Sequence, residues 1–327
     1  MLKHLMVLSD GTEIFSGPYE INAIENVKLT HRVNTGKGLR LGCVFAAVAE
    51  ISLFAPAEGL YITPDTDFTL YQVTEDGIRQ KIGLFTIHRV THSSVHRYRI
   101  IAYDRIARLN KYIAWWLKTL TDWPYYLPEL LEKICDFCDL TLKENPIPNS
   151  WWLVERPPLD RLTAKQLMEW ICQISGRFCR ATPDGQIELS WYAPRDIAIT
   201  PSGSCYTFLD SLQADDFPAP AIDKVELWSL DVGSYGTYGQ GANSYHLYDT
   251  PVVDNHSDEE LAMAAEELYN VLHPIRYTPC KLTVPATAGI AAGDILLVTD
   301  VNGRTFQTYI MSRIRNGQRD TLECIGK

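Results

Sequence analysis

The feature that most constrains the fold is a series of short strand-forming segments separated by tight turns. Three segments in the N-terminal third are rich in Thr, Tyr, Ile and Phe and lack a helical period: 61–73, 84–92 and 97–103. Asp76-Gly77 lies between the first two, and an Asp-Gly pair supplies the positive φ that a tight hairpin needs. This spacing predicts a small β-barrel or sandwich over residues 1–103.

The pattern changes at Asp104, where apolar residues begin to recur at helical spacing. Three helices are predicted, the first through Ile106, Leu109, Ile113 and Trp116, the second from Pro128, and the third from the capping pair Thr163 and Gln166 to Gly176. A hairpin with the turn Asp184-Gly185 follows. Residues 104–215 are therefore predicted to form an inserted α+β domain.

Strand patterns return beyond Pro218 and Pro220. A loop rich in Gly and Tyr is expected at 233–241, followed by a helix at 257–272 with Ser257 and Glu260 as its capping box. The later strand-like segments are 281–284, 295–298, 306–311 and 322–325. Residues 216–327 are therefore predicted to form a second β-barrel with one embedded helix.

The two β portions share a local theme. Segment 68–73 leads through Asp76-Gly77 to 85–90, and segment 295–298 leads through Asn302-Gly303 to 309–314. This weak internal repeat favours an α+β, mainly β fold in which two related barrels flank an inserted domain. The alternative is that unrelated β-hairpins share the same simple pattern.

Charge and hydropathy exclude several classes of protein. The chain has 30 Lys and Arg against 40 Asp and Glu, a net charge of −10, which disfavours specific nucleic-acid binding and docking on anionic lipid. Its longest apolar run is too short for a membrane span, and its N-terminus does not resemble a signal peptide. We expect a protein without a membrane anchor, kept where it is made, with reduced cysteines at positions 43, 135, 138, 172, 179, 205, 280 and 324.

Few residues suggest metal or redox chemistry. His88, His92 and His96 could hold a zinc ion, but no completing carboxylate lies nearby in sequence, and solvated hairpin histidines are the favoured interpretation. Cys135 and Cys138 form a lone Cys-x-x-Cys late in an apolar helix, where core packing is favoured over a redox pair. No metal and no cofactor is therefore expected.

Catalytic motifs are absent from the sequence. It contains no Gly-x-Ser-x-Gly, no His-Glu-x-x-His and no complete phosphate loop, and Asp215-Asp216 is interpreted as part of a loop. We therefore predict that the protein is not an enzyme. The residues chosen as interface candidates are Tyr235, Tyr238, Tyr245 and Tyr248, because tyrosines in a Gly-rich loop can contact protein or sugar; a surface loop with nothing bound is the alternative.

Three stretches together resemble the tail hub (baseplate hub) proteins of bacteriophages and related contractile injection machines. They are 83–90 continuing to 100–104 and Leu109, then 167–176 with 180–189, and finally 235–248 with Thr250-Pro251, 257–272, Tyr277-Thr-Pro279 and Gly293-Asp294-Ile295. The resemblance implies two tube-protein-like β-barrels with an inserted α/β domain.

The resemblance also implies a mechanical role. Three copies would form a homotrimer that adapts a hexameric tail tube to a trimeric tip or spike, within the tail of a phage, prophage or related injection machine. Its partners would be a tail tube or distal tail protein and a spike, tip or fibre protein, assembled in the bacterial host cytoplasm into the virion tail. DNA would pass through the ring without specific binding. A tail-associated cell-wall hydrolase and a carbohydrate-binding β module stay open as alternatives.

Overall fold

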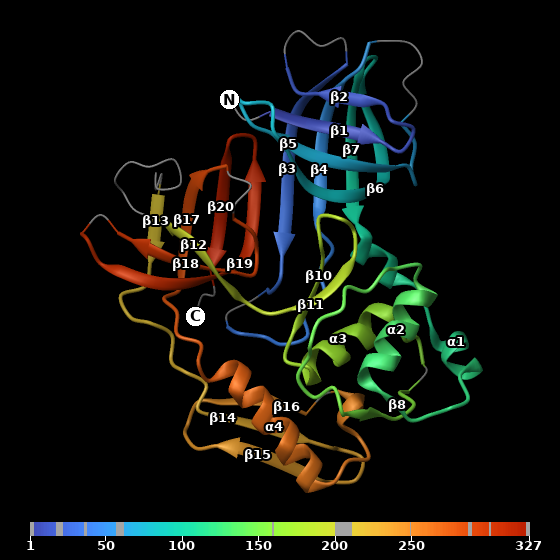
Figure 1. Ribbon diagram of the computed structural model, residues 1–327, viewed down its shortest axis with the longest axis vertical. Coiled ribbons are helices and arrows are strands. Elements are labelled where there is room, and N and C mark those ends of the chain that lie inside the picture. Colours follow the sequence, from blue (N-terminus) through green and yellow to red (C-terminus); the bar gives the residue numbers. More distant parts are fainter. Residues whose placement is uncertain are drawn as a thin grey trace.

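A computed structural model gives the fold of most of the chain. It describes residues 3–17, 22–35, 38–56, 62–158, 160–199, 211–248, 250–286, 290–300 and 302–324. The predictions for Tyr61, Cys205 and Ile325 lie outside these described residues. Figure 1 shows a β-barrel at one end, a second sheet beside it and a helical part at the other end. No helix in the described part of the chain has the length and apolar character needed to cross a membrane.

The N-terminal strands form a closed barrel of seven strands. They are β1 Lys3–Leu8, β2 Glu13–Phe15, β3 Ala23–Arg32, β4 Val48–Phe54, β5 Asp67–Val73, β6 Arg79–Ser94 and β7 Arg97–Asp104. The order around the barrel is β1-β5-β6-β7-β4-β3-β2, and β2 completes the ring by pairing with both β1 and β3. Alternate residues such as Phe68 and Leu70 are buried inside, so the mainly β character predicted here is confirmed.

A second sheet, here called the C-terminal sheet, gathers six strands from two parts of the chain. They are β12 Ala193–Ile199, β13 Ser211–Ala214, β17 Cys280–Pro285, β18 Asp294–Thr299, β19 Thr305–Asn316 and β20 Arg319–Cys324. Their order is β12-β18-β19-β20-β17-β13, and within the described residues β12 and β13 are its two edges. Leu282, Leu296 and Ile310 lie in a core separate from that of the barrel.

The barrel and the C-terminal sheet share one strand order. If β2 is left out and the six strands of each are numbered along the chain, both sheets run first-fourth-fifth-sixth-third-second. Four of the five neighbouring pairs are antiparallel in both, whereas β1–β5 is antiparallel and β12–β18 is parallel. The two hairpins related by the sequence repeat, β5–β6 and β18–β19, therefore occupy equivalent places.

The two sheets are joined directly. The second half of β3 pairs with β19, so that Leu29 lies opposite Arg315 and Thr30 opposite Ile314. Arg315 is 1% exposed, and its guanidinium binds Asp320 in the same sheet and Gln72 in β5 of the barrel. Strand pairing and a buried polar contact thus connect the two units.

Between the sheets the chain forms a helical part with its own core. Its elements are the 3₁₀ helix η1 Arg105–Asn110, α1 Ala114–Thr119, β8 Tyr125–Tyr126, α2 Leu127–Phe137, β9 Leu153–Val154, α3 Ala164–Ile174, β10 Phe178–Ala181 and β11 Ile187–Ser190. The second and third predicted helices are confirmed. Pro128 lies in the first turn of α2, and Thr163 and Gln166 form the capping box of α3.

The first predicted helix is wrong as a single element, because the chain forms η1 and then the short α1. Lys111 between them is extended. The Ile113 N–H donates to the Leu162 carbonyl at 3.0 Å, and the Ala164 N–H donates to the Lys111 carbonyl at 2.9 Å. These bonds to the segment before α3 replace the helical ones, so tertiary pairing overrides the apolar periodicity.

A three-stranded sheet and one long helix complete the structure. They comprise β14 Lys224–Trp228, β15 Tyr235–Gly239, β16 Ser244–Leu247, the 3₁₀ helix η2 Pro251–Val253 and α4 Asp258–Leu272. The predicted helix 257–272 is confirmed, with Ser257 and Glu260 as its capping box. This unit packs into the core of the helical part, where the Trp152 indole N–H donates to the Val252 carbonyl at 2.7 Å.

The arrangement of strands shows where the predicted boundary between residues 215 and 216 falls. It lies after β13, so β12 and β13 of the C-terminal sheet precede it, while β14–β16 and α4 beyond it share a core with the helical part. The loop predicted at 233–241 is wrong, because residues 235–239 form β15. Gly236 is required there, since an added Cβ would lie 2.2 Å from the backbone of Leu261 in α4.

Candidate functional site

Exposed aromatic and aliphatic side chains gather on the three-stranded sheet. Its inner face packs on α4, whereas its outer face is here called the outer sheet face and is formed by Lys224, Glu226, Trp228, Tyr235, His246 and Tyr248. Trp228 is 43% exposed and its ring lies 4.5 Å from that of Tyr235. The following turn adds the exposed Leu230 and Val232. Exposed aromatics with adjoining aliphatic residues are typical of a protein contact surface.

The centre of the outer sheet face is a carboxylate held by three partners. The Tyr235 hydroxyl donates to Glu226 at 2.6 Å, the Lys224 ammonium lies 2.9 Å away, and His246 Nδ1 lies 2.8 Å away. The hydrogen bond from Tyr235, followed by that from Lys224, lowers the pKa of Glu226. The group is therefore ionised at neutral pH and fixes the ring of Tyr235 beside Trp228.

The four candidate tyrosines lie in different environments. Tyr235 and Tyr248 are on the outer sheet face. Tyr238 lies on the opposite side, against the Tyr269 ring of α4 at a centroid distance of 5.2 Å. Tyr245 points inward, where its hydroxyl accepts a hydrogen bond from the Leu41 N–H at 3.0 Å and burial raises its pKa to about 12. Two of the four tyrosines therefore lie on one exposed surface. The sequence analysis did not identify Trp228, which lies beside Tyr235 on the same surface.

The three candidate histidines do not converge. His88 packs on Tyr103, His92 on Tyr98 and His96 on Phe54, at ring-centroid distances of 5.3, 4.6 and 6.3 Å. Irregular pairing of β6 with β7 at residues 88 and 93 breaks the alternation that would align the first two. Among the residues that the structure describes, no three His, Cys, Asp or Glu side chains are arranged to hold a metal ion.

The Cys-x-x-Cys pair lies at the end of α2. Cys135 and Cys138 are both buried among apolar side chains. Desolvation raises the pKa of Cys138 to about 11 and raises the pKa of Cys135 as well. A redox pair needs an acidified thiol, so this geometry fits packing.

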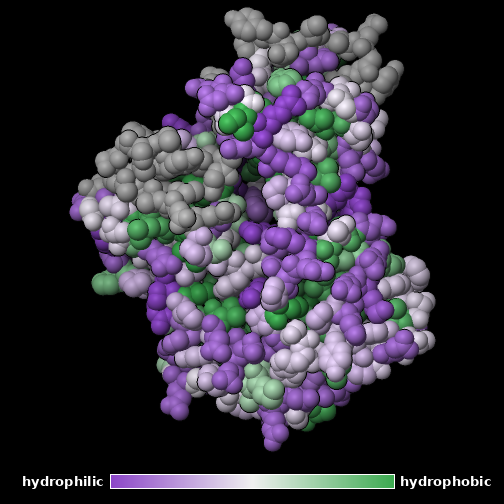
Figure 2. All heavy atoms as spheres, viewed as in Figure 1, coloured by the Kyte–Doolittle hydropathy of each residue, from purple (hydrophilic) through white to green (hydrophobic). Residues whose placement is uncertain are grey.

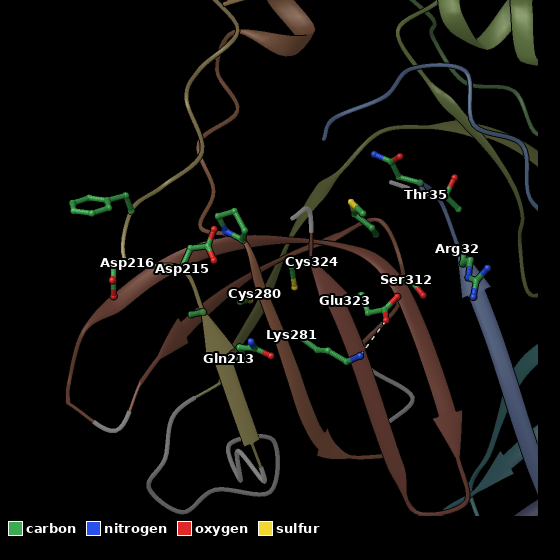
Figure 3. A pocket seen from close by; sticks show the side chains of 15 residues that line it. Arg32, Thr35, Gln213, Asp215, Asp216, Cys280, Lys281, Ser312, Glu323 and Cys324 are labelled. Carbon is green, nitrogen blue, oxygen red and sulfur yellow. Dashed lines mark hydrogen bonds and ion pairs between the residues drawn. The ribbon is translucent and has the colours of Figure 1, made fainter. Parts of the chain in front are cut away.

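An open pocket, here called the edge pocket, lies at the end of the C-terminal sheet. Its volume is about 880 Å³. Figure 3 shows side chains from β3, β13, β17 and β20 around it, with Lys281 paired to Glu323 at 3.4 Å. Asp215 and Asp216 lie on its rim, where their backbone carbonyls accept hydrogen bonds from Arg304. Cys280 and Cys324 also line it.

A smaller cavity of about 240 Å³ lies where the barrel, the β10–β11 hairpin and the C-terminal sheet meet. Arg180 binds Glu188 at 3.1 Å beside it, and Asp104 lies at its wall with a side chain that caps η1. Burial raises the pKa of Asp104 to about 7. Arg180 binds Glu188 on the neighbouring strand, and three other cations at the cavity, Lys81, Arg313 and Arg315, bind acidic residues outside its lining, so the charges here mainly join structural elements.

On the face seen in Figure 2, hydrophobic residues form small separated groups among hydrophilic ones. Such a surface offers several limited contact areas on this face.

No family model matches the chain, and no curated protein matches it by sequence. Solved structures do match along nearly its whole length. The 43 kDa tail protein of prophage MuSo2 from Shewanella oneidensis has a TM-score of 0.60 at 9% identity, covering 99% of this chain and 97% of that one. The fold is that of phage tail proteins.

Two further structures agree. The tail protein from Neisseria meningitidis MC58 has a TM-score of 0.60 at 12% identity, covering 99% of this chain and 96% of that one. Prophage tail protein gp18 from Listeria monocytogenes EGD-e has a TM-score of 0.57 at 11% identity, covering 98% and 94%. At these identities the similarity concerns architecture, and it extends over the barrel, the helical part and the C-terminal sheet together.

Proposed function

We propose that the chain is a structural tail hub of a phage, prophage or related injection machine, and that it has no catalytic activity. The observation that carries this proposal is the shared strand order of the barrel and the C-terminal sheet. A chain with two similar β units can present six similar surfaces from three copies, which suits a junction between sixfold and threefold parts. The full-length architectural similarity to phage tail proteins supports the same role.

In this proposal three copies form a ring that joins a hexameric tail tube, or a distal tail protein, to a spike, tip or fibre protein. The acidic balance suits a channel for DNA, because a negatively charged wall does not retain phosphates. The ring would assemble in the host cytoplasm and function in the virion tail. Its domains would be the barrel at 1–103, the insert at 104–215 and a second barrel at 216–327. Strands β12 and β13, before this last boundary, pair within the C-terminal sheet, whereas β14–β16 and α4, after it, pack with the helical part.

The outer sheet face is the proposed contact with a neighbouring tail protein. Trp228 and Tyr248 supply rigid aromatic area, and Glu226 is already neutralised by partners within the chain, so burying it would leave no unpaired charge. We expect Trp228→Ala to weaken assembly at least tenfold while changing the thermal midpoint little. Trp115→Ala is the matched control, because Trp115 is also exposed but lies on α1.

The test is to co-express the chain with a tail-tube protein from the same genome and to measure the mass and symmetry of the complex. A threefold ring bound to a sixfold tube, lost with Trp228→Ala and retained with Trp115→Ala, is the expected result. A monomer that stays unbound in the presence of the tube protein contradicts the hub role. Hydrolysis of peptidoglycan by the purified chain contradicts the non-enzymatic assignment.

A carbohydrate-binding module is the second candidate, and one observation favours it. The exposed Trp228 ring lies beside Tyr235 and polar groups on a flat surface, which is the kind of platform on which a sugar ring can stack. Saturation-transfer NMR with cell-wall glycan fragments separates the candidates. Glycan contacts at Trp228 on a monomer would favour the module, and their absence together with tube binding would favour the hub.

A further inference from the structure

We propose that Cys280 and Cys324 form an oxidisable dithiol at the floor of the edge pocket, and that a disulfide reagent converts them to a cross-strand disulfide between β17 and β20. This site is independent of the hub role. It is carried by the register of two strands and by a pocket that opens onto both sulfur atoms.

The register places the two cysteines face to face. In the antiparallel β17–β20 pair, Lys281 lies opposite Glu323 and Leu282 opposite Leu322, so one further step places Cys280 opposite Cys324. Directly opposite residues have Cα separations of roughly 4.5 or 5.5 Å, and disulfides span Cα separations of roughly 4.4–6.8 Å. The backbone therefore needs no rearrangement for the bond to form.

The side chains already interact. The Cys280 and Cys324 thiols share a hydrogen bond, and Cys280 Sγ also lies 3.4 Å from the Thr308 hydroxyl. The bond to Cys324 lowers the pKa of Cys280, while the same bond raises the pKa of Cys324.

The surroundings give a reagent access. Cys280 is 7% exposed and Cys324 is 5% exposed, and both line the edge pocket of about 880 Å³. Figure 3 shows them on neighbouring strands, with the Lys281 and Glu323 side chains at the next position along the strands. The Lys281 ammonium can attract an anionic disulfide such as oxidised glutathione to this place.

The chain contains a matched pair that lacks this access. Cys172 on α3 and Cys179 on β10 also share a hydrogen bond, but both are fully buried in the core of the helical part. Neither of them lines the edge pocket or the smaller cavity beside Asp104. Oxidation that depends only on thiol proximity would affect both pairs, whereas oxidation through the edge pocket selects Cys280 and Cys324.

The chemistry is a double thiol–disulfide exchange. The thiolate of one cysteine, written here for Cys280, attacks one sulfur of oxidised glutathione, forming a mixed disulfide and releasing one glutathione thiolate. Cys324 then loses its proton and attacks the Cys280 sulfur, releasing the second glutathione. The protein loses two hydrogens and two electrons pass to the reagent, which becomes two reduced glutathione molecules. The product joins the first residue of β17 to the last residue of β20.

The experiment uses the folded full chain with Cys205→Ser, because Cys205 lies outside the described residues. The protein is treated with oxidised glutathione, acid-quenched, alkylated, digested with trypsin and examined by mass spectrometry. We expect peptide 277–281 linked to peptide 320–327, an intact mass lower by two hydrogens, and a thermal midpoint that rises on oxidation and returns with dithiothreitol. Cys172 and Cys179 should keep their thiols during the oxidation and should therefore be recovered in the alkylated form.

Two single variants test the second exchange. Cys324→Ser and Cys280→Ser should each stop at a stable glutathione adduct on the remaining cysteine, because closing the disulfide needs the partner thiol. The proposal is overturned if native protein retains both thiols until it is denatured, or if Cys172–Cys179 oxidises as readily. The disulfide-linked peptide is detected in protein that keeps both cysteines, so the test does not depend on whether either variant folds.

Discussion

The barrel and the C-terminal sheet follow one strand order but differ in how the first strand of that order is paired. In the barrel, the three-residue strand β2 lies between the first and second strands of the common order and completes the ring. In the C-terminal sheet, the described residues contain no counterpart of β2, and its first strand joins in the parallel direction. The comparison teaches that one strand order accommodates either direction of the first strand, because β1 is antiparallel to β5 whereas β12 is parallel to β18.

The C-terminal sheet is joined to the barrel by strand pairing and by one buried side chain. Strand β19 pairs with β3 of the barrel, and Arg315 on β19 reaches Gln72 on β5 at 2.7 Å. The barrel needs no such contact to satisfy its strands, because each has two neighbours within the ring. We therefore expect changes at this junction to destabilise the C-terminal sheet more than the barrel.

The largest effect is expected from Arg315→Met. Arg315 binds both oxygens of Asp320, at 2.9 and 3.0 Å, and Asp320 has no exposed surface. Removing Arg315 leaves Asp320 with Arg313 at 2.7 Å as its remaining guanidinium partner, so the cost should stay at or below about 3–5 kcal/mol, the cost of an uncompensated buried charge. Hydrogen exchange should show faster opening of β19 and β20, with the barrel strands largely protected. All eight tryptophans lie between residues 115 and 228, so fluorescence would report mainly on the helical part.

Two controls sharpen this result. Arg97→Met removes an exposed pair with Glu25 on the barrel and should cost less than about 1 kcal/mol. The double variant Arg315→Met, Asp320→Leu should recover only part of the lost stability, because removing Asp320 also takes away the carboxylate that Arg313 binds at 2.7 Å. Equal acceleration of exchange in both sheets would mean that they unfold as one unit, and the contrast between them would fail.

The second-largest effect concerns the residue at which the sixth strand of each sheet ends. The sixth strand of the common order ends at the buried Asp104 in the barrel and at Cys324 in the C-terminal sheet. Burial raises the pKa of Asp104 from 3.8 to about 7, so the folded state holds a proton that the unfolded chain releases. The free energy of unfolding should therefore fall as pH rises from about 4 to about 7, by at most about 1.4 kcal/mol per pH unit for this group.

Asp104→Asn tests this directly. The amide oxygen can still accept the hydrogen bond from the Ile106 N–H, now 3.1 Å from the carboxylate, and it does not ionise. Urea unfolding at pH 4.5, 6 and 8 should show a variant that gains on the wild type as pH rises and is more stable at pH 8. A difference that is constant across this range would mean that Asp104 stays ionised in the folded protein.

Local features of the fold were predictable from the sequence. The capping residues Thr163 and Ser257, the proline at 128 and the Asp-Gly and Asn-Gly turns mark element ends through short-range hydrogen bonds and backbone preferences. The equivalence of hairpins β5–β6 and β18–β19 was visible as a weak repeat for the same reason. These signals depend on neighbours within a few residues.

Long-range pairing was not predictable in this way. Nothing local marks β3 as the partner of β19, or β12 as the parallel neighbour of β18, because those choices depend on how whole sheets pack. The candidate tyrosines show the same limit: period and composition identified the segment, but the strand register decided that Tyr245 points inward and Tyr248 outward. Gly236 suggested a loop locally, whereas the approach of α4 explains it.

The smallest effect concerns cross-strand charges at equivalent places. Glu50 on β4 binds two cations, Lys28 on β3 and Arg99 on β7, each at 2.8 Å. In the C-terminal sheet, Glu323 on β20 lies 3.4 Å from Lys281 on β17, a longer and more exposed pair. The hydrogen bond from Lys28, followed by that from Arg99, lowers the pKa of Glu50.

We expect Glu50→Gln to cost up to about 1 kcal/mol and Glu323→Gln to cost only a few tenths, since exposed pairs contribute little and the barrel carboxylate has two close partners. The Glu50 effect should shrink in 1 M salt, where the screening length falls to about 3 Å, and as pH falls through the lowered pKa of Glu50, because the protonated group no longer binds the two cations. A larger loss for Glu323→Gln would mean that the C-terminal sheet depends on cross-strand charge more than the barrel does, which would reverse the comparison.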